Sequence, residues 1–274
     1  MEKLISVLMP VFKANPQFLE QSVESILSQT HSEIELIIIL DPYDHQTDHS
    51  TLEVLELFRD DHRSRLIVNK TRLGLISSMN KGIRLAQGDF MGRMDCDDIA
   101  MPTRIEEQVD WLSRKGLDLV GCWSYVIDDN GKILGSLHPP SDWLTIRKYL
   151  LLQSPFIHSS VLFSQHVVKT IGLYNPNFEL SEDYEFYLRA FSNGFMGANI
   201  PSYLHFLREH PKSLIRSKKW KKDRFLHTKN VFSAFFSYGF RKPLDLTFLL
   251  ITPLCVFIKP SHVLFFKRLF GFYK

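Results

Sequence analysis

The sequence lacks the motifs and the long hydrophobic runs that mark several large protein classes. Its 274 residues contain no G-x-G-x-x-G after the first predicted strand and no G-x-x-x-x-G-K-S/T, which argues against NAD binding and against a P-loop. The longest apolar stretch, residues 244–258, is shorter than the ~20 residues needed to span a bilayer and includes Asp245 and Pro253. Internal repeats and low-complexity linkers are also absent, so we expect one large core with or without a small appendage.

Cysteine and net charge are scarce too. The three cysteines, Cys96, Cys122 and Cys255, show no metal-type spacing, which fits a reducing compartment. The sequence carries Glu2 and passes directly into a predicted strand, so we do not expect a signal peptide. A net charge of +3 is too small to indicate a nucleic-acid partner. We therefore expect a cytoplasmic protein that binds no nucleic acid.

Strand and helix patterns alternate in the N-terminal part of the chain. Asn15 precedes Pro16 at the start of an apolar pattern with helical spacing, as is typical of a capped helix. A continuous β-branched run that ends at Leu40 indicates a strand buried on both faces. The strands predicted here cover residues 4–9, 35–40, 65–68 and a stretch that begins at Phe90. Their alternation with helices predicts an α/β fold with a doubly wound, mostly parallel sheet, whose ligands bind at the carboxyl ends of the strands.

The pattern changes after residue 117. Asp128-Asp-Asn-Gly131 lies between two strand-like segments and predicts a hairpin. A helix is expected over residues 182–193 and a last strand over residues 204–208. Beyond it, seven of the thirteen residues from 212 to 224 are Lys or Arg, and two apolar segments follow. We therefore divide the chain into one folded domain, residues 1–211, and a basic and apolar, helical extension, residues 212–274.

The most informative local feature is an acidic turn after the fourth predicted strand. Asp95, Asp97 and Asp98 fall close together, and carboxylates held so near one another repel unless a positive charge compensates them. A hard divalent cation, Mg²⁺ or Mn²⁺, does this well and can share a diphosphate as its remaining ligand. The alternative is a solvated acidic turn that leads into a helix starting at Pro102, with Asp98 or Thr103 as helix-entry residue.

Other polar and aromatic residues lie at the same predicted edge of the sheet. Asp41 follows the second strand, where a carboxylate can accept a hydrogen bond from a base or a ribose; the alternative is a loop acid that caps a turn before Pro42. Phe12 follows Pro10 and the first strand, and it can either stack on a base or pack in the core. Asn69 follows the third strand. Pro10, Phe12 and Asp41 are therefore candidates for the nucleotide side of a site.

A second pair of acids, Glu182-Asp183, stands at the start of a predicted helix, with Ser181 as a candidate N-cap. The positive end of the helix dipole favours an ionised Asp183, which in a cleft can accept a hydroxyl proton as a general base. The alternative is an acid that only stabilises its own helix. His158 and His210 are candidate ligands or phosphate partners, or else structural donors. Candidates for pairing with these carboxylates are Arg93, Arg104 and Arg189; the alternative for each is a structural ion pair.

In order and spacing, these features resemble the family 2 glycosyltransferases of GT-A fold, along nearly all of residues 4–215. The matching stretches are residues 6–12, 22–30, 35–41, Gly74 with 80–82, 88–89, 94–98, and 181–184 with Arg189. The run over residues 93–99 is most similar to the branch that builds bacterial exopolysaccharides, capsules and O-antigens. The resemblance implies a GT-A type sheet in residues 1–211.

The resemblance also implies roles for individual residues. Asp41 matches the acid that binds the uracil, and Phe12 matches the aromatic residue near the base. Asp97 matches the principal metal ligand, with Asp95 as the first acid of the D-x-D motif. Asp183 matches the general base that deprotonates the acceptor hydroxyl.

Two further positions carry over less directly. His210 falls where some members of the family have a contact to the diphosphate or the metal. Asp41 stands alone between Leu40 and Pro42, whereas the family usually has two acids before a Gly-Ser turn. Pro10 belongs to the first matching stretch and is grouped with the nucleotide-binding residues.

The implied activity is an inverting, metal-dependent transfer of one hexosyl or N-acetylhexosaminyl group. The donor is a nucleotide-diphosphate sugar, UDP-linked, and the acceptor is a hydroxyl of a lipid-diphosphate-linked glycan in bacterial surface polysaccharide biosynthesis. The Q-x-x-R-W signature of processive synthases is absent, which favours transfer of a single sugar. Two alternatives stay open: a sugar nucleotidyltransferase, and a non-catalytic nucleotide-sugar-binding subunit of a polysaccharide assembly complex.

The composition of the extension predicts where the acceptor lies. The basic stretch around Trp220 is followed by the apolar residues 244–258 and the aromatic-rich residues 263–273. Such a composition fits binding to an anionic leaflet, so we expect a peripheral protein on the inner face of the cell membrane. The alternative is a helical bundle that packs on the catalytic domain or on another subunit.

Overall fold

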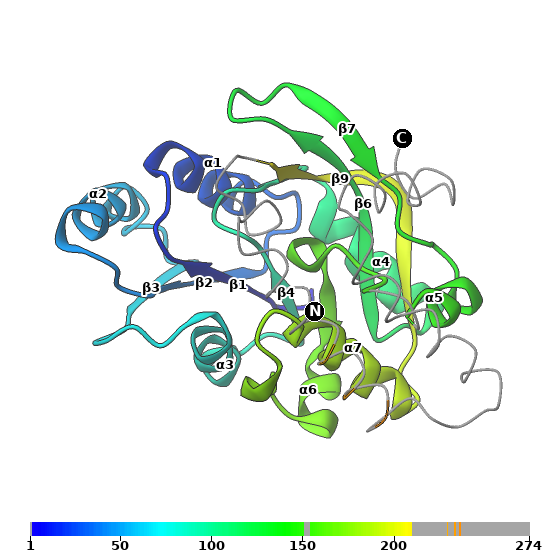
Figure 1. Ribbon diagram of the computed structural model, residues 1–274. Helices are drawn as coiled ribbons and strands as arrows, with labels where there is room; N and C mark the ends of the chain where they lie inside the picture. The colour runs from blue at the N-terminus through cyan, green and yellow to red at the C-terminus, as the bar shows by residue number, and fades with distance from the viewer. Residues whose placement is uncertain (1, 151–153, 210–228, 230–232, 234–235, 237–274) are drawn as a thin grey trace.

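The computed structural model describes residues 2–150, 154–209, 229, 233 and 236. Helices and strands alternate through this part of the chain (Figure 1). In chain order they are β1 (Ile5–Val11), α1 (Pro16–Leu27), β2 (Ile34–Leu40), α2 (His45–Glu56), β3 (Ser64–Val68), α3 (Leu75–Leu85), β4 (Phe90–Arg93), β5 (Ile99–Ala100), α4 (Arg104–Lys115), β6 (Leu119–Ile127), β7 (Ile133–Leu137), α5 (Trp143–Leu150), the 3₁₀ turn His158–Ser160, β8 (Leu162–Ser164), α6 (Gln165–Ile171), the 3₁₀ turn Pro176–Phe178, α7 (Glu182–Ser192) and β9 (Gly197–Arg208).

One sheet joins the strands of the described residues, in the order β3-β2-β1-β4-β8-β6-β9-β5, with β7 paired to β6. β1 to β4 are mutually parallel neighbours, and β6 pairs with β9 in parallel as well. β8 enters antiparallel between β4 and β6, and β5 is antiparallel to β9. The mixed, mostly parallel sheet confirms the predicted fold class.

Alternate residues of the central strands bury into two separate cores. Leu8 of β1 lies in one core with Met79 and Ile83 of α3, while Val7 and Met9 lie in the other core, which includes side chains of α1. Helices therefore cover both faces of the sheet, α1 and α2 on one side and α3, α6 and α7 on the other (Figure 1). Sheets covered on both faces need apolar residues at every position, which is what the β-branched run of β2 supplies.

The N-terminal part confirms the local predictions closely. Asn15 caps α1, because its Oδ1 accepts hydrogen bonds from the N–H groups of Gln17, at 2.9 Å, and Phe18, at 3.4 Å. The hairpin predicted around Asp128-Asp-Asn-Gly131 is formed by β6 and β7. The last strand is longer than predicted, since β9 begins at Gly197 rather than near Leu204.

One short strand next to the acidic turn was not predicted. The turn is followed by β5, and the predicted helix, α4, begins at Arg104 rather than Pro102, with the predicted entry residue Thr103 before it. The reason is a distant contact, since Ile99 and Ala100 pair with Phe206 and His205 of β9. A strand partner so far along the chain leaves no signature in the local sequence.

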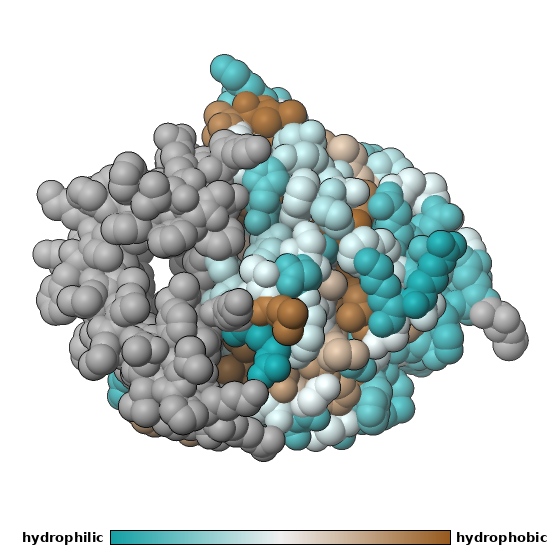
Figure 2. Space-filling view, turned by 90° about the vertical axis from the view of Figure 1, so that its right-hand side faces the viewer, coloured by the Kyte–Doolittle hydropathy of each residue, from teal (hydrophilic) through white to brown (hydrophobic). Residues whose placement is uncertain are grey.

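The predicted extension, residues 212–274, lies outside the described residues apart from three isolated positions. In the described part of the chain, no helix combines the length and the apolar character required to cross a bilayer. On the face shown in Figure 2, the described residues are largely polar or of intermediate hydropathy, and the hydrophobic ones form small separate areas. The domain boundary and the membrane contact therefore remain predictions.

Candidate active site at the carboxyl edge of the sheet

The pairing register of the parallel strands places the carboxyl ends of β1, β2, β3 and β4 at the same edge of the sheet. Val11 is paired with Leu40, Leu40 with Val68, and Leu8 of β1 with Arg93 at the end of β4. The residues that follow these strand ends are Phe12, Asp41, Asn69 and the acidic turn 95–98. The structure thus gathers at one edge the residues that the sequence placed after successive strands, where doubly wound sheets bind their ligands.

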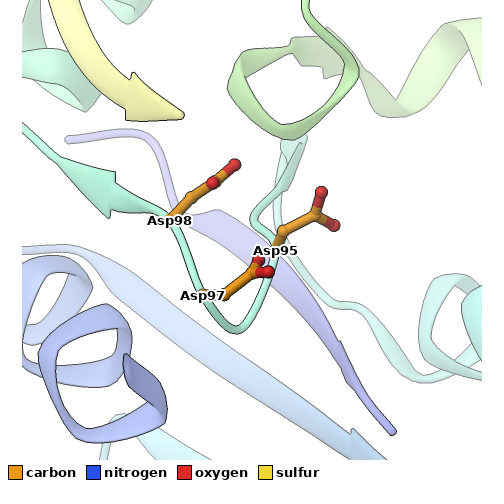
Figure 3. Close-up of side chains that lie close together, drawn as sticks. All are labelled: Asp95, Asp97 and Asp98. Atoms are coloured by element: carbon orange, nitrogen blue, oxygen red, sulfur yellow. The ribbon is translucent and has the colours of Figure 1, made fainter. Parts of the chain in front are cut away.

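The acidic turn brings three carboxylates together between β4 and β5 (Figure 3). One oxygen atom of each of Asp95, Asp97 and Asp98 lies within 4.8 Å of the others. Burial, together with the negative charges of Asp98 and Asp95, raises the pKa of Asp97 to about 8. Burial also raises the pKa of Asp95. The raised pKa values mean that the protein compensates this negative charge only in part.

This donor set fits a hard divalent cation. Carboxylate oxygens are the ligands that Mg²⁺ and Mn²⁺ prefer, and a bound cation would offset both the burial and the neighbouring negative charges that raise the pKa of Asp97. Asp97 and Asp95 are the residues that would hold it, because both are half-buried while Asp98 is fully buried. The predicted metal residues of this turn are therefore found together.

Arg93 is the immediate neighbour of Asp95. Its Nη2 atom lies 2.8 Å from Asp95 Oδ1, and the arginine side chain is only 8% exposed whereas that of Asp95 is 34% exposed. Of the arginines considered from the sequence, Arg93 alone is paired with an acid of the turn among the described residues. The ion pair therefore holds the carboxylate of Asp95 in a fixed position.

Asp98 was predicted either as part of a metal site or, with Thr103 as the other choice, as the entry residue of the next helix; the entry residue is Thr103, directly before α4. Its Oδ1 accepts a hydrogen bond from the N–H of Arg208 at 2.8 Å, and its Oδ2 lies 3.3 Å from Nε2 of His205. Nδ1 of His205 is in turn 2.8 Å from the hydroxyl of Ser124. Burial raises the pKa of Asp98, but His205, Ser159 and the Arg208 N–H outweigh it, so that its pKa is lowered. Asp98 thus connects the turn to β9.

Asp41 organises the loop that follows β3. Its Oδ1 accepts hydrogen bonds from Leu73 N, at 2.7 Å, and Asn69 Nδ2, at 3.1 Å; its Oδ2 accepts one from Gly74 N at 2.8 Å. A carboxylate has about four acceptor positions, so three protein donors leave room for one more. The predicted contact to a base stays a prediction, and the structure adds that Asp41 shapes the surrounding loop.

Phe12 lies in a cluster of aromatic and cationic side chains rather than in the core. The guanidinium of Arg72 stacks 4.4 Å from the centre of its ring, and the ring of Tyr43 meets it edge-on at 5.5 Å. The ammonium of Lys13 lies 3.5 Å from the centre of the Tyr43 ring. Aromatic faces and positive charges at the ends of β1 and β2 suit a base and its phosphates. Arg72, Tyr43 and Lys13 were not singled out from the sequence.

The second pair of acids begins α7 beside the same edge. Glu182 and Asp183 are half-buried, and burial together with the charge of Asp183 raises the pKa of Glu182 to about 7. Arg93 and Asp95 also act electrostatically on Glu182, which places the start of α7 near the acidic turn. The residues predicted as base and as metal ligands are therefore near one another, and their roles remain predictions.

The remaining candidates have structural partners or lie outside the described residues. His158 Nδ1 is 2.6 Å from the Tyr187 hydroxyl, and burial with the charge of Arg93 lowers the pKa of His158 well below its usual value. Arg104 donates to the Ser159 carbonyl at 3.1 Å, and Arg189 pairs with Glu185. Arg189 thus forms the structural ion pair that was its alternative, Arg104 is bonded to a main-chain carbonyl, and His210 lies outside the described residues.

His205 and Arg208 are residues that sequence reasoning passed over. They lie near the end of β9, with two apolar residues between them, and both contact Asp98. The sequence did contain a hint of their importance: a histidine and an arginine stand in a largely apolar strand. Both side chains are buried in the structure, which is unusual for charged or titratable residues. What the sequence did not reveal was the partner.

Comparison with known proteins follows the same lines. Residues 6–168 match the family model described as Glycosyl transferase family 2. The chain is 30% identical over 222 residues to an uncharacterized glycosyltransferase of Methanocaldococcus jannaschii, which covers 80% of this chain and 76% of that protein. It is 29% identical over 219 residues to the O-antigen biosynthesis glycosyltransferase WbnJ of Escherichia coli, covering 78% of this chain and 83% of WbnJ.

Among solved structures, the chain is similar to S. aureus TarS 1-349 in complex with UDP-GlcNAc. The TM-score is 0.70 at 14% sequence identity, and the match covers 91% of this chain and 71% of that chain. In a structure of a longer TarS chain the match spans 42% of its length. At this level of identity the likeness shows a shared fold.

Proposed function

Because the chain belongs to glycosyltransferase family 2, we propose that it transfers a single sugar, with inversion, from a UDP-linked donor to a glycan hydroxyl. The observation that carries this proposal is the acidic turn: three carboxylates within 4.8 Å at the carboxyl edge of the sheet, beside the start of α7. The family assignment also bears on the alternatives left open by the sequence. It favours a glycosyltransferase over a sugar nucleotidyltransferase and over a binding subunit.

Two groups of residues support the proposed donor, one on the side of the base and one on the side of the diphosphate. Asp41, Phe12 and Pro10 border the place proposed for the uracil, and Arg72 and Lys13 supply positive charge next to it. Asp95 and Asp97 are proposed to hold Mg²⁺ or Mn²⁺ against the diphosphate, with His210 as a further contact. The UDP-GlcNAc held by TarS, a protein of the same fold, supports a UDP-linked donor.

The reaction is proposed as one in-line displacement. The acceptor oxygen forms a bond to the anomeric carbon as the bond from that carbon to the diphosphate oxygen breaks, and the diphosphate leaves with the electron pair. Asp183 takes the acceptor proton on the face opposite the leaving group, so the configuration inverts. A bound divalent cation stabilises the charge on the departing diphosphate.

The direct test is a panel of nucleotide sugars incubated with the full-length chain and Mn²⁺, with release of nucleoside diphosphate as the readout. We expect turnover with a UDP-sugar, and its loss when a chelator is added. Turnover that survives chelation would contradict the metal, and turnover with none of the donors would contradict the proposed activity. A thermal-shift screen of the same panel ranks donors before an acceptor is known.

The acceptor is proposed as a lipid-diphosphate-linked glycan at the inner face of the cell membrane. Support comes from the basic and aromatic composition of residues 212–274 and from the similarity to WbnJ, an O-antigen biosynthesis glycosyltransferase. Flotation of the full-length chain with anionic and with neutral vesicles tests the membrane contact. A variant with glutamine at positions 218, 219, 221 and 222 is the matched control. Equal flotation with both kinds of vesicle would count against an anionic surface.

A further inference from the structure

Arg208, the last residue of β9, touches more parts of the site than any other side chain discussed above. Its Nε donates to the main-chain carbonyl of Asp97 at 2.8 Å. Its Nη1 donates to the carbonyl of Asp128 at 3.1 Å, and its Nη2 donates to Gln21 Oε1 at 2.8 Å. The guanidinium also lies 4.1 Å from the centre of the Phe18 ring. One buried arginine thus joins the acidic turn, the β6–β7 hairpin and α1.

Arg208 contacts Asp97, the residue of the turn that is proposed as the principal metal ligand. The Arg208 side chain donates a hydrogen bond to the main-chain carbonyl of Asp97, and the Arg208 main-chain N–H donates one to the carboxylate of Asp98. Arg208 therefore anchors two consecutive residues of the turn. At the other end of the turn, the hydroxyl of Ser22 donates to the carbonyl of Asp95 at 2.8 Å. None of these bonds uses the carboxylates of Asp95 or Asp97. They therefore fix the main chain that carries those two carboxylates, while the carboxylate of Asp95 is itself paired with Arg93.

We propose that Arg208 is a positioning residue that fixes the acidic turn in the geometry required for divalent-metal binding. The inference rests on the proposed metal role of Asp97 and Asp95. Its physical basis is that Asp95, Asp97 and Asp98 repel one another, so the turn needs bonds from outside to stay closed. A planar guanidinium with five N–H donors is suited to this, because it can bond several fixed acceptors at once.

The test compares Arg208→Gln and Arg208→Lys with the wild-type chain in Mn²⁺ binding, measured by the electron paramagnetic resonance signal of free Mn²⁺. Loss of a group that orients a metal ligand typically weakens metal affinity about 10- to 100-fold. We expect a loss of that size for Arg208→Gln and a smaller one for Arg208→Lys, since an ammonium reaches fewer of the acceptors. The metal alone is the probe, so the readout is independent of turnover.

A matched control separates positioning from general stability. Arg189 is also buried and makes several bonds, to Glu185 and to the carbonyls of Ile171 and Leu173, but none to the acidic turn. Arg189→Gln should lower the melting temperature while leaving the Mn²⁺ dissociation constant within about twofold of wild type. If both arginine variants weakened Mn²⁺ binding alike, the effect of Arg208 would be one of stability and the proposal would fall.

Two milder variants keep the proposal testable if Arg208→Gln does not fold. Gln21→Leu removes one acceptor of Arg208, and Ser22→Ala removes the other anchor of the turn. Each should weaken Mn²⁺ binding severalfold in a folded protein. Wild-type Mn²⁺ affinity in a folded Arg208→Gln variant, or in both of these milder variants, would overturn the positioning role of Arg208 but leave the proposed metal site standing. Absence of Mn²⁺ binding in the wild-type chain would instead overturn the proposed metal site.

Discussion

The carboxylates that follow β2 and β4 lie on the same edge of the sheet in opposite surroundings. Asp41 accepts hydrogen bonds from three N–H donors of the loop at residues 69–74. Asp97 has two further carboxylates as neighbours, and their charge together with burial raises its pKa to about 8. The Asp41 carboxylate already has three donors from the protein and keeps one acceptor position, while the acidic turn carries a negative charge that a cation would balance. This contrast separates an acid that builds the site from an acid that serves the reaction.

Asp97→Ala should have the largest effect, because it removes the acid proposed as the principal metal ligand. We expect transfer to fall about 10³-fold or more, the scale on which a preorganised electrostatic contribution is lost. Metal-dependent donor binding should disappear with it, as measured by calorimetry with and without Mn²⁺. Asp110→Ala, which removes an exposed acid of α4, is the control and should leave both quantities unchanged. Donor binding that still responds to Mn²⁺ in Asp97→Ala would remove Asp97 as the principal ligand.

Asp183→Asn should separate the chemistry from metal binding. The amide cannot take the acceptor proton, so we expect turnover to fall by about 10²- to 10⁴-fold. Donor affinity and its Mn²⁺ dependence should stay as in the wild type, because Asp183 is proposed to face the acceptor. The two measurements are initial rates and calorimetric titration of the same preparation. Retained turnover would end the assignment of Asp183 as the base.

Asp41→Ala should mainly reduce stability. It removes the acceptor of three N–H groups, and bonds to a charged group contribute ~1.5–3 kcal/mol each, so we expect a loss of about 3 kcal/mol or more. Urea unfolding followed by circular dichroism measures this. Asp89→Ala, at an exposed acid paired with Lys3, should change the free energy of unfolding by no more than about 0.5 kcal/mol. Equal stability of the two variants would show that the Asp41 bonds contribute little.

Gly74→Ala tests the same loop through its backbone. Gly74 has φ 82° and ψ 166°, a region that L-residues other than glycine hardly occupy, so alanine should cost about 1–3 kcal/mol. Because Gly74 N donates to Asp41, we also expect weaker UDP binding. Gly131→Ala, at φ 79° in the hairpin, should lose stability without affecting UDP affinity. An unchanged UDP affinity in Gly74→Ala would detach this loop from the nucleotide.

The last prediction concerns how the stability of the metal-free protein changes with pH. The pKa of Asp97 is about 8 in the folded chain against an ordinary value of 3.8, so the folded state binds more protons between these values. Its contribution to stability is therefore present below the ordinary pKa and is lost as pH rises through about 8. Urea titrations at several pH values should show this decline, and Asp97→Asn should flatten it. A slope that is the same in Asp97→Asn would assign it to other groups.

Much of the fold could be predicted because its signals are local. Asn15 and Pro16 mark the start of α1, and the β-branched run of β2 marks a buried strand, since both depend on neighbours within a few residues. The parallel order then places Asp41 and the acidic turn on one edge. The short strand β5 and the function of Asp98 were missed, because both depend on β9.

What the sequence determined by itself is the order of strands and helices and the identity of the acids at one edge of the sheet. Hydrophobic periodicity and capping residues act over one turn or one strand, so they can be recognised without the fold. Only the tertiary structure decided how the acidic turn is held, because Asp97 and Arg208 lie 111 residues apart in the chain. Contacts at that separation form when β9 completes the sheet, and no local pattern encodes them.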